Sequence, residues 1–324
     1  MPSPLSRPTP ARPVADFSGL WIPLVTPFLR GPADQADRAD PVDHAALRAL
    51  VHSLRSQGIA GFVACGSTGE AAALDEAEQD AALDTVLAAA DGLPVVMGLS
   101  GYHLGHVLAR VRSLAHRPLA GLLVPPPHYV RPSQAGLQGW FESIAEASAF
   151  PLIVYDIPYR TGATLELATL RALARHPRIR ALKDCGGQAA KTQALIADGA
   201  LQVLAGEDAQ IFSTLAAGGA GAIAASAHWQ PARWVQCMQA IAAGDLQRAR
   251  QLWQALLPLV EPFFAEPNPA PIKALLAAQG QMEGGLRAPM TAASPALAQH
   301  MVALAEQQDA VLARLVGCDP LPRT

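Results

Sequence analysis

The segment Arg178–Gly187 reads RIRALKDCGG, and it places a lysine at the end of an apolar run that has the character of a buried β-strand. That lysine, Lys183, is unusual for this chain. Of the 24 lysine and arginine residues only three are lysines, at positions 183, 191 and 273. A chain that otherwise uses arginine therefore ends a strand in lysine, which makes this position a candidate for chemistry that arginine cannot perform.

The run that ends in Lys183 is one of eight short apolar runs that alternate with longer segments of helical periodicity. Eight β/α units of this length predict a TIM (β/α)8 barrel, an α/β fold with a closed parallel sheet. A doubly wound open sheet is the alternative, but no GxGxxG motif follows the first predicted strand. The predicted strands are Trp21–Val25, Gly61–Cys65, Val95–Gly98, Gly121–Val124, Leu152–Tyr155, Ile179–Lys183, Gln202–Leu204 and Gly221–Ala225.

The helical segments divide the chain into three predicted parts. Asp75–Ala90 has acidic residues in its first turn, and Ser133–Ala149 opens on a serine that suits an N-cap. About three further helices follow the eighth unit, from Pro231 to Val316, and would form a C-terminal helical extension. We therefore predict a disordered proline-rich leader over residues 1–17, the barrel over 18–230 and a helical domain over 231–324, with the polar insert Arg30–Pro41 at the surface.

Composition excludes several classes of function. The 324 residues are 51% apolar and 16% charged, with a net charge of -3, so nothing favours binding to nucleic acid or to an anionic membrane. No apolar stretch is long enough to span a bilayer, and the N-terminus lacks the apolar core of a signal peptide. The cysteines and histidines show no metal-ligand spacing. We expect a cytoplasmic protein with reduced thiols, small-molecule substrates, no metal and no cofactor.

Polar residues follow several of the predicted strands, and in a barrel the carboxyl ends of all strands meet at one mouth. Ser67 and Thr68 lie in GSTGE, which follows the second strand, and Tyr155 and Arg160 lie in YDIPYRTG, which follows the fifth. Lys183 ends the sixth strand. A lysine that is desolvated there has a lowered pKa, and its free amine can attack a ketone carbonyl to form a Schiff base.

Each of these residues also has a purely structural interpretation. Lys183 could pair with Asp184 or extend to water, and Tyr155 could be a core residue with a satisfied hydroxyl. GSTGE could be a plain β-α turn that caps a helix, and Arg160 could form a surface ion pair. The convergence of all of them at one mouth favours the functional interpretation.

The ordered motifs GSTGE, YVRPSQ, YDIPYRTG, LKDCGG, AGED and EPNPAPIK resemble the class I aldolase-like family typified by dihydrodipicolinate synthase and N-acetylneuraminate lyase. The resemblance extends from about Ser18 to the C-terminal helices. It implies a TIM barrel, a homotetramer built as a dimer of dimers, and a Schiff base between Lys183 and pyruvate or a related 2-oxo acid.

The resemblance also implies a role for each motif residue. Tyr155 would be the proton shuttle, and Ser67 would link it to Tyr129, which reaches in from a neighbouring subunit. Thr68, with nearby backbone N–H groups, would hold the pyruvate carboxylate. Arg160 would bind the carboxylate of a second substrate, and Gly206 and Ile223 would line the pocket.

Arg160, RPSQ and RTG favour the synthase branch of the family and predict a lyase that condenses pyruvate with aspartate semialdehyde. Asp156 and Tyr159, where the family usually has asparagine and a small residue, keep open an aldolase or dehydratase for a sugar-derived or aromatic 2-oxo acid. A non-catalytic paralogue that binds a 2-oxo acid is the alternative of another class. Because the lysine-binding positions of inhibited synthases differ here, we expect no feedback by lysine; they read Glu76, Gln79, Tyr102, His106 and His128.

Overall fold

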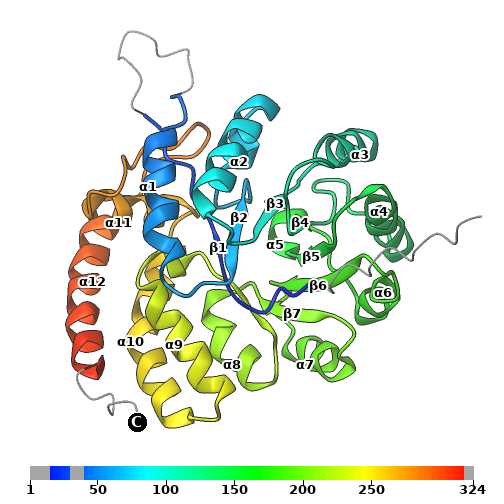
Figure 1. Cartoon of the computed structure of the whole chain (residues 1–324). Helices are drawn as coiled ribbons and strands as arrows, with labels where there is room; N and C mark the ends of the chain where they lie inside the picture. The colour runs from blue at the N-terminus through cyan, green and yellow to red at the C-terminus, as the bar shows by residue number, and fades with distance from the viewer. Residues whose placement is uncertain (1–14, 30–39, 317–324) are drawn as a thin grey trace, which may run out of the picture.

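The computed structural model describes residues 15–29 and 40–316, and its centre is a closed barrel of parallel strands (Figure 1). Each strand pairs with the next one along the chain, and β8 closes the sheet on β1. The predicted (β/α)8 barrel is confirmed, and the open doubly wound sheet is excluded because the sheet is closed. The strands are β1 Gly19–Pro23, β2 Gly61–Ala64, β3 Val95–Gly98, β4 Gly121–Val124, β5 Leu152–Asp156, β6 Ile179–Asp184, β7 Gln202–Ala205 and β8 Gly221–Ile223.

The strands form where short runs of β-branched and other apolar residues are buried on both faces, as a parallel sheet covered by helices requires. The predicted bounds are within two residues throughout. The largest difference is at β1, which begins at Gly19 because Gly19 and Leu20 already pair with β8. Side chains that point inward fill the barrel, among them Trp21, Ile153 and Leu204. The barrel interior is therefore a packed core that leaves chemistry to the strand ends.

Helices surround the barrel, and sequence features explain where the helices predicted at Asp75–Ala90 and Ser133–Ala149 begin. Asp75 accepts a hydrogen bond from the backbone of Glu78, whose side chain bonds back to Asp75, so α2 begins with a capping box. Ser133 caps α4 in the same position that the sequence predicts. The helices up to β8 are α1 His44–Arg55, α2 Glu76–Ala90, α3 Leu104–Ser113, α4 Gln134–Ala147, α5 Pro158–Thr161, α6 Leu167–Leu173, α7 Ala189–Asp198 and α8 Ile211–Ala216.

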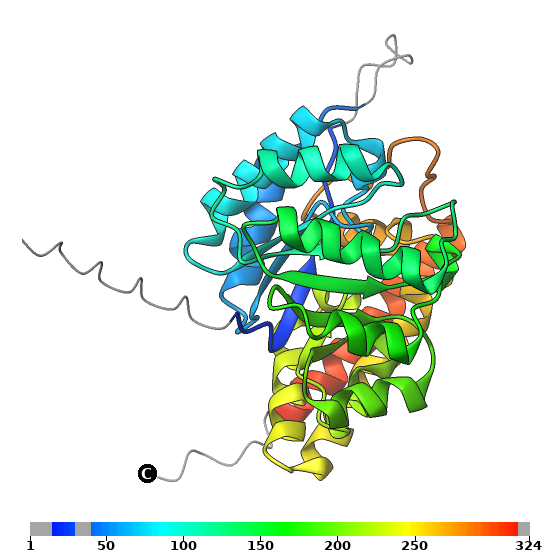
Figure 2. The same cartoon turned by 90° about the vertical axis from the view of Figure 1, so that its right-hand side faces the viewer.

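After β8 the chain forms four helices in the stretch where about three were predicted. They are α9 Pro231–Ala242, α10 Leu246–Phe264, α11 Ala270–Ala278 and α12 Pro295–Val316. The count differs because α9 contacts β1 and α8 and so completes the eighth β/α unit. α10 packs between α9 and α12 on one flank of the barrel (Figures 1 and 2). Most of the leader and of the polar insert lies outside the described residues.

Candidate active site

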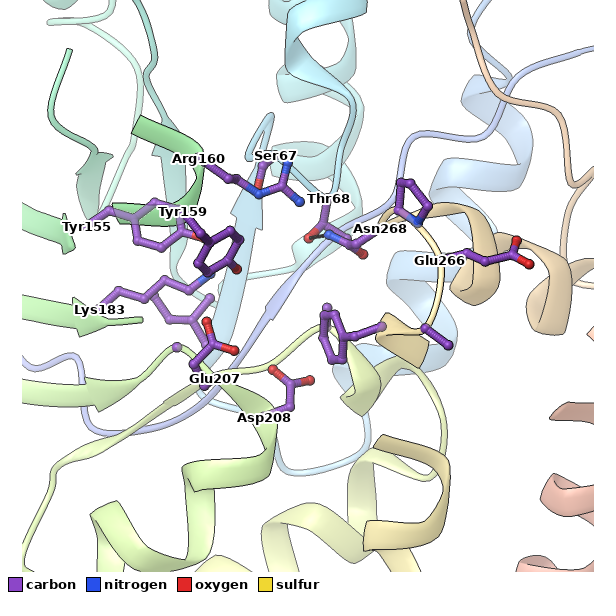
Figure 3. A pocket seen from close by; sticks show the side chains of 16 residues that line it. Ser67, Thr68, Tyr155, Tyr159, Arg160, Lys183, Glu207, Asp208, Glu266 and Asn268 are labelled. Atoms are coloured by element: carbon purple, nitrogen blue, oxygen red, sulfur yellow. Dashed lines mark hydrogen bonds between the residues drawn. The ribbon is translucent and has the colours of Figure 1, made fainter. Parts of the chain in front are cut away.

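The carboxyl ends of the strands surround a cavity of about 390 Å³ (Figure 3). Seven of the eight residues that the sequence predicts for the site line this cavity, and Tyr129 is the exception. The lining residues are Ser67, Thr68, Tyr155, Tyr159, Arg160, Lys183, Gly206, Glu207, Asp208, Ile223, Ala225 and the segment 264–268.

Lys183 is the penultimate residue of β6, lines this cavity and is only 5% exposed. Burial lowers the pKa of its amine, and Arg160 lowers it further, while the carboxylates of Asp208 and Glu207 act in the opposite direction. The alternative in which Lys183 pairs with Asp184 is wrong. Asp184 instead accepts hydrogen bonds from the Gly186 N–H, at 2.8 Å, and from the Thr192 hydroxyl, at 2.5 Å. The amine therefore lines the cavity unpaired with Asp184, and its burial there lowers its pKa from the usual value.

Tyr155 lies on β5 directly beside Lys183 in the register of the sheet. The Lys183 Nζ atom is 4.3 Å from the centroid of the Tyr155 ring. Burial raises the pKa of Tyr155 well above its usual value, and a side-chain hydrogen bond with Ser67 partly opposes that rise. The phenol consequently keeps its proton at neutral pH, and its hydroxyl can donate a proton to one partner while accepting from another.

Gly206 follows β7 at a point where no side chain fits. A Cβ atom built there would lie 2.4 Å from the Cys185 Sγ atom and 2.9 Å from the Lys183 Cγ atom. The absence of a side chain at Gly206 thus leaves room for the stem of Lys183 and for the buried thiol of Cys185. Ile223, at the end of β8, adds a fully buried apolar wall to the same region.

The GSTGE loop is held from three directions. The Thr26 hydroxyl donates to the Gly69 carbonyl at 2.7 Å, and the Asn268 side chain donates to the Thr68 hydroxyl at 3.1 Å. The buried Lys273 ammonium contacts Glu70 at 2.7 Å. Among residues 15–29 and 40–316, the backbone N–H groups at 67 and 68 have no hydrogen-bond acceptor. These two N–H groups and the hydroxyls next to them can therefore receive an anion.

Arg160 lies on the short helix α5, and its guanidinium is 6.0 Å from the ring centroid of Tyr159. Figure 3 shows Arg160 beside Ser67 and across the cavity from Glu207 and Asp208. The surface ion pair considered as an alternative is not among the ion pairs of the described residues. The guanidinium can instead bind a planar anion such as a carboxylate in the cavity.

Two carboxylates and the segment 264–268 belong to the cavity although the sequence did not assign them. Asp208 is buried, accepts a hydrogen bond from the Ser226 N–H at 2.7 Å, and has its pKa raised by burial to about 6. Glu207 Oε1 and Asn268 Oδ1 are buried without a hydrogen-bond partner among the described residues. AGED could have revealed Glu207 and Asp208, because they directly follow Gly206, which the resemblance had assigned. EPNPAPIK was among the motifs of the resemblance, but none of its residues had been given a role.

Tyr129 is not brought into the cavity of its own chain. Its side chain is 90% exposed, and its backbone has the left-handed φ of 74°. It lines a second hollow with His128 and Arg131, which shares Tyr159 and Arg160 with the cavity. Its predicted role in a neighbouring subunit stays a prediction.

Metal-binding clusters and membrane-spanning helices are both absent from the part of the chain that the structure describes. No group of three or more His, Cys, Asp or Glu side chains within residues 15–29 and 40–316 has a metal-binding arrangement. Among the helices that the structure describes, none has both the length and the apolar character needed to cross a bilayer. The fold and the cavity define a (β/α)8-barrel enzyme that presents a buried lysine beside a tyrosine at its strand ends.

Comparison with known proteins gives the family. Residues 16–308 match the dihydrodipicolinate synthetase family, and the chain belongs to that family. It is 35% identical to 4-hydroxy-tetrahydrodipicolinate synthase of Sorangium cellulosum over 88% of this chain and 94% of the relative. It is 33% identical to the synthase of Methanoculleus marisnigri over 85% of this chain and 93% of the relative. The chain is accordingly a lyase of the class I aldolase type.

Solved structures agree with this assignment. The 4-hydroxy-tetrahydrodipicolinate synthase of Methylacidiphilum fumariolicum SolV superposes with a TM-score of 0.87 at 25% identity, covering 93% of this chain and 99% of that one. A dihydrodipicolinate synthase of Cyanidioschyzon merolae, solved with lysine bound, superposes with a TM-score of 0.84 at 26% identity, covering 91% and 99%.

Proposed function

We propose that this lyase condenses pyruvate with aspartate semialdehyde, the reaction of a 4-hydroxy-tetrahydrodipicolinate synthase in lysine biosynthesis. The observation that carries the proposal is the buried Lys183 amine, 4.3 Å from the Tyr155 ring centroid in a cavity that also holds Arg160. The names of the relatives in Sorangium and Methanoculleus support the choice of substrates.

In the proposed reaction the free amine of Lys183 attacks the ketone carbon of pyruvate, and loss of water gives an iminium ion. The iminium withdraws electrons from the adjacent methyl carbon, so a proton can leave that carbon without a metal ion and an enamine forms. The enamine carbon then attacks the aldehyde carbon of the second substrate. The amine of aspartate semialdehyde can finally displace Lys183 from the imine carbon, which closes a ring and returns the enzyme.

The other residues take the roles that their positions allow. Tyr155 relays the protons of iminium and enamine formation, and Ser67 connects it to Tyr129 of a neighbouring subunit. Thr68 and the N–H groups beside it hold the pyruvate carboxylate. Arg160 binds the carboxylate of the second substrate, while Gly206 and Ile223 shape the cavity around Lys183.

The proposal also covers the domain organisation of the chain, its oligomeric state and its location in the cell. It divides the chain at about residues 17 and 230 into leader, barrel and helical domain, with α9 at the start of the last part also packed on β1 and α8 of the barrel. A homotetramer, as a dimer of dimers, would bring Tyr129 to a partner's cavity, and the exposed Tyr102 and Val130 suit such a contact. A cytoplasmic location fits small-molecule substrates.

Two measurements test the proposal. Borohydride reduction in the presence of pyruvate should add one pyruvate-derived mass to the peptide that contains Lys183, and the absence of that adduct would refute the Schiff base. Steady-state turnover of pyruvate with aspartate semialdehyde, compared with a panel of other aldehydes and 2-oxo acids, identifies the second substrate. Robust turnover of any of them would rule out a non-catalytic paralogue.

A second candidate is an aldolase or dehydratase for a sugar-derived 2-oxo acid. It is favoured by the carboxylates of Glu207, Asp208 and Glu266 at the cavity, because carboxylates accept hydrogen bonds from hydroxyl groups. Fast turnover with aspartate semialdehyde, and slow turnover with the hydroxylated substrates of the panel, would exclude this candidate.

A further inference from the structure

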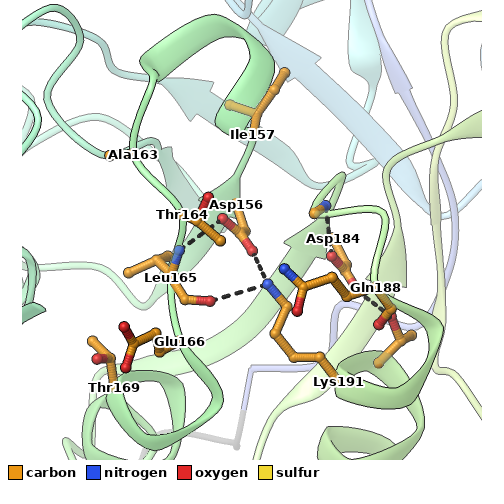
Figure 4. Close-up of polar contacts among 12 residues, drawn as sticks. Asp156, Ile157, Ala163, Thr164, Leu165, Glu166, Thr169, Asp184, Gln188 and Lys191 are labelled. Carbon is orange, nitrogen blue, oxygen red and sulfur yellow. Dashed lines mark hydrogen bonds and ion pairs between the residues drawn. The ribbon is translucent and has the colours of Figure 1, made fainter.

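Asp156 and Lys191 form a buried ion pair (Figure 4), and neither residue is part of the cavity lining. The Asp156 side chain is 0% exposed and that of Lys191 is 4% exposed, and the Nζ and Oδ2 atoms are 2.5 Å apart. Asp156 is the residue after Tyr155 at the end of β5, and Lys191 lies on α7, the helix that follows β6. The pair therefore joins the two β/α units that carry Tyr155 and Lys183.

Both partners also bind the backbone of the same residue, Leu165. The Leu165 N–H donates to Asp156 Oδ1 at 3.3 Å, and the Lys191 ammonium donates to the Leu165 carbonyl at 3.0 Å. Gly186 closes the arrangement, since a Cβ atom there would lie 2.7 Å from Asp156 Oδ2 and 2.8 Å from Lys191 Nζ. The ion pair thus holds both polar backbone groups of Leu165 in a site with no room for rearrangement.

The residues on either side of Leu165 are fixed in a similar way by Gln134 at the start of α4. Its side-chain amide donates to the Thr164 carbonyl at 2.8 Å, and its oxygen accepts from the Glu166 N–H at 3.1 Å. Side chains from α4, β5 and α7 therefore hold the consecutive residues 164–166. These residues are the C-terminal end of the loop that begins at Ile157. This loop carries Arg160 and Tyr159 into the cavity.

The main influences on the pKa of Lys183 are its burial and the neighbouring Cys185, Asp208, Glu207 and Arg160, and the ion pair is not one of them. Stability is also a weak reason for keeping such a pair, since the cost of desolvating two charges offsets most of their attraction. What the contacts do achieve is to fix the end of the loop that presents Arg160.

We propose that Asp156 and Lys191 are positioning residues that set the Arg160 loop for the second substrate's carboxylate. The inference rests on the proposed role of Arg160. Without the pair, the loop would sample several positions, and binding of the second substrate would weaken while chemistry at Lys183 with pyruvate continued.

The test compares Lys191→Met with Asp156→Asn/Lys191→Met in the full-length enzyme. Lys191→Met leaves a buried carboxylate without its cation, and we expect KM for aspartate semialdehyde to rise about tenfold or more, with KM for pyruvate changed less than about twofold. The double variant leaves no unpaired charge but still loses the contact between Lys191 and the Leu165 carbonyl, so its KM for the semialdehyde should fall below that of Lys191→Met and stay severalfold above the wild-type value. Should Lys191→Met fail to fold, the double variant still decides: KM raised only for the semialdehyde supports the proposal, and wild-type values overturn it.

Arg171→Met is the matched control. It removes an exposed contact at 2.7 Å between Arg171 and Asp198, which also joins the neighbouring helices α6 and α7 but does not touch the loop. We expect wild-type kinetics from this variant. The pair would have only a structural role if Lys191→Met raised both KM values equally. The same conclusion would follow if Arg171→Met also raised KM for the semialdehyde.

Hydrogen–deuterium exchange without substrates separates this proposal from the proposed function. We expect faster exchange over residues 157–166 in Lys191→Met, with an unchanged exchange rate in β3 and β4 and an intact borohydride adduct with pyruvate. A wild-type enzyme that forms the adduct but does not use the semialdehyde would refute the proposed second substrate alone. Unchanged exchange over 157–166 would overturn the positioning role, whichever substrate the enzyme uses.

Discussion

The Lys183 amine lies 4.3 Å from the centre of the Tyr155 ring, and the two residues are register partners on adjacent strands. Side chains at paired positions of a parallel sheet project from the same face, so the barrel itself sets this relationship. Arg160 and Tyr129 are different, because a loop or a short helix presents each of them. The proposed nucleophile and the proposed proton relay therefore lie on the regular strands of the barrel, while the groups proposed for the second substrate and for a partner subunit lie on less regular segments.

Lys183→Arg should fold and be inactive. Arginine keeps a positive charge at the same position but stays protonated, so it cannot form an imine. We expect turnover to fall at least about a thousandfold, with no pyruvate adduct after borohydride treatment. Steady-state kinetics and mass spectrometry check both effects, and circular dichroism confirms the fold. Wild-type turnover in this variant would overturn the assignment of Lys183 as nucleophile.

Lys183→Met should be more stable than the wild type at neutral pH. Because burial lowers the pKa of Lys183 below its usual 10.5, the unfolded chain binds more protons than the folded chain between the two pKa values. The wild-type free energy of unfolding therefore rises with pH between the two pKa values. The total rise is about 1.4 kcal/mol for each unit by which the folded and unfolded pKa values differ. Thermal melts should show the variant's advantage narrowing as the pH approaches 10.5; an advantage that grows with pH contradicts this.

Gly206→Ala should disturb the position of Lys183. The new methyl group would overlap Cys185 Sγ at 2.4 Å and Lys183 Cγ at 2.9 Å, and overpacking of this kind costs about 1–3 kcal/mol of stability. We expect a lower melting temperature together with a marked fall in kcat. Gly139→Ala on α4 is the control, because nothing lies within 4 Å of its added Cβ atom. Equal behaviour of the two variants would show that the close approach at Gly206 is unimportant.

Asp208→Asn should move the acidic limb of the pH–rate profile to lower pH. The Asp208 carboxylate raises the pKa of Lys183, so its removal makes the free amine available at lower pH. The asparagine oxygen can still accept the Ser226 N–H that Asp208 binds at 2.7 Å, which should preserve the fold. We expect a shift of about one pH unit or less in the single-turnover rate of pyruvate adduct formation. A shift to higher pH would show that the charge of Asp208 does not act on Lys183.

The barrel, and the placement of Lys183 and Tyr155 around one cavity, could be predicted from the sequence because both depend on local patterns. β3 and β4 have the predicted bounds, since each is an apolar run with abrupt polar or proline-containing flanks. Lys183 and Tyr155 are recognisable because polar residues at the ends of buried strands stand out. The segment 264–268 was missed as a wall of the cavity, because its approach depends on how α10 and α11 pack on the barrel. The Asp156–Lys191 pair likewise depends on the docking of α7, which no local pattern encodes.

Lysine at millimolar concentration should leave turnover unchanged. Four of the five positions that differ from lysine-inhibited synthases, Glu76, Gln79, Tyr102 and His106, line a separate cavity of about 240 Å³. Arg110 and a second histidine, His103, line it as well, and the rings of the two histidines are 4.1 Å apart.

A cavity whose one carboxylate is accompanied by a guanidinium offers little attraction to a ligand with two ammonium groups. Initial rates with and without L-lysine check this, with D-lysine as the control for ionic strength. Clear inhibition by L-lysine alone would show that these side chains form a lysine site after all, and would place regulation at this cavity.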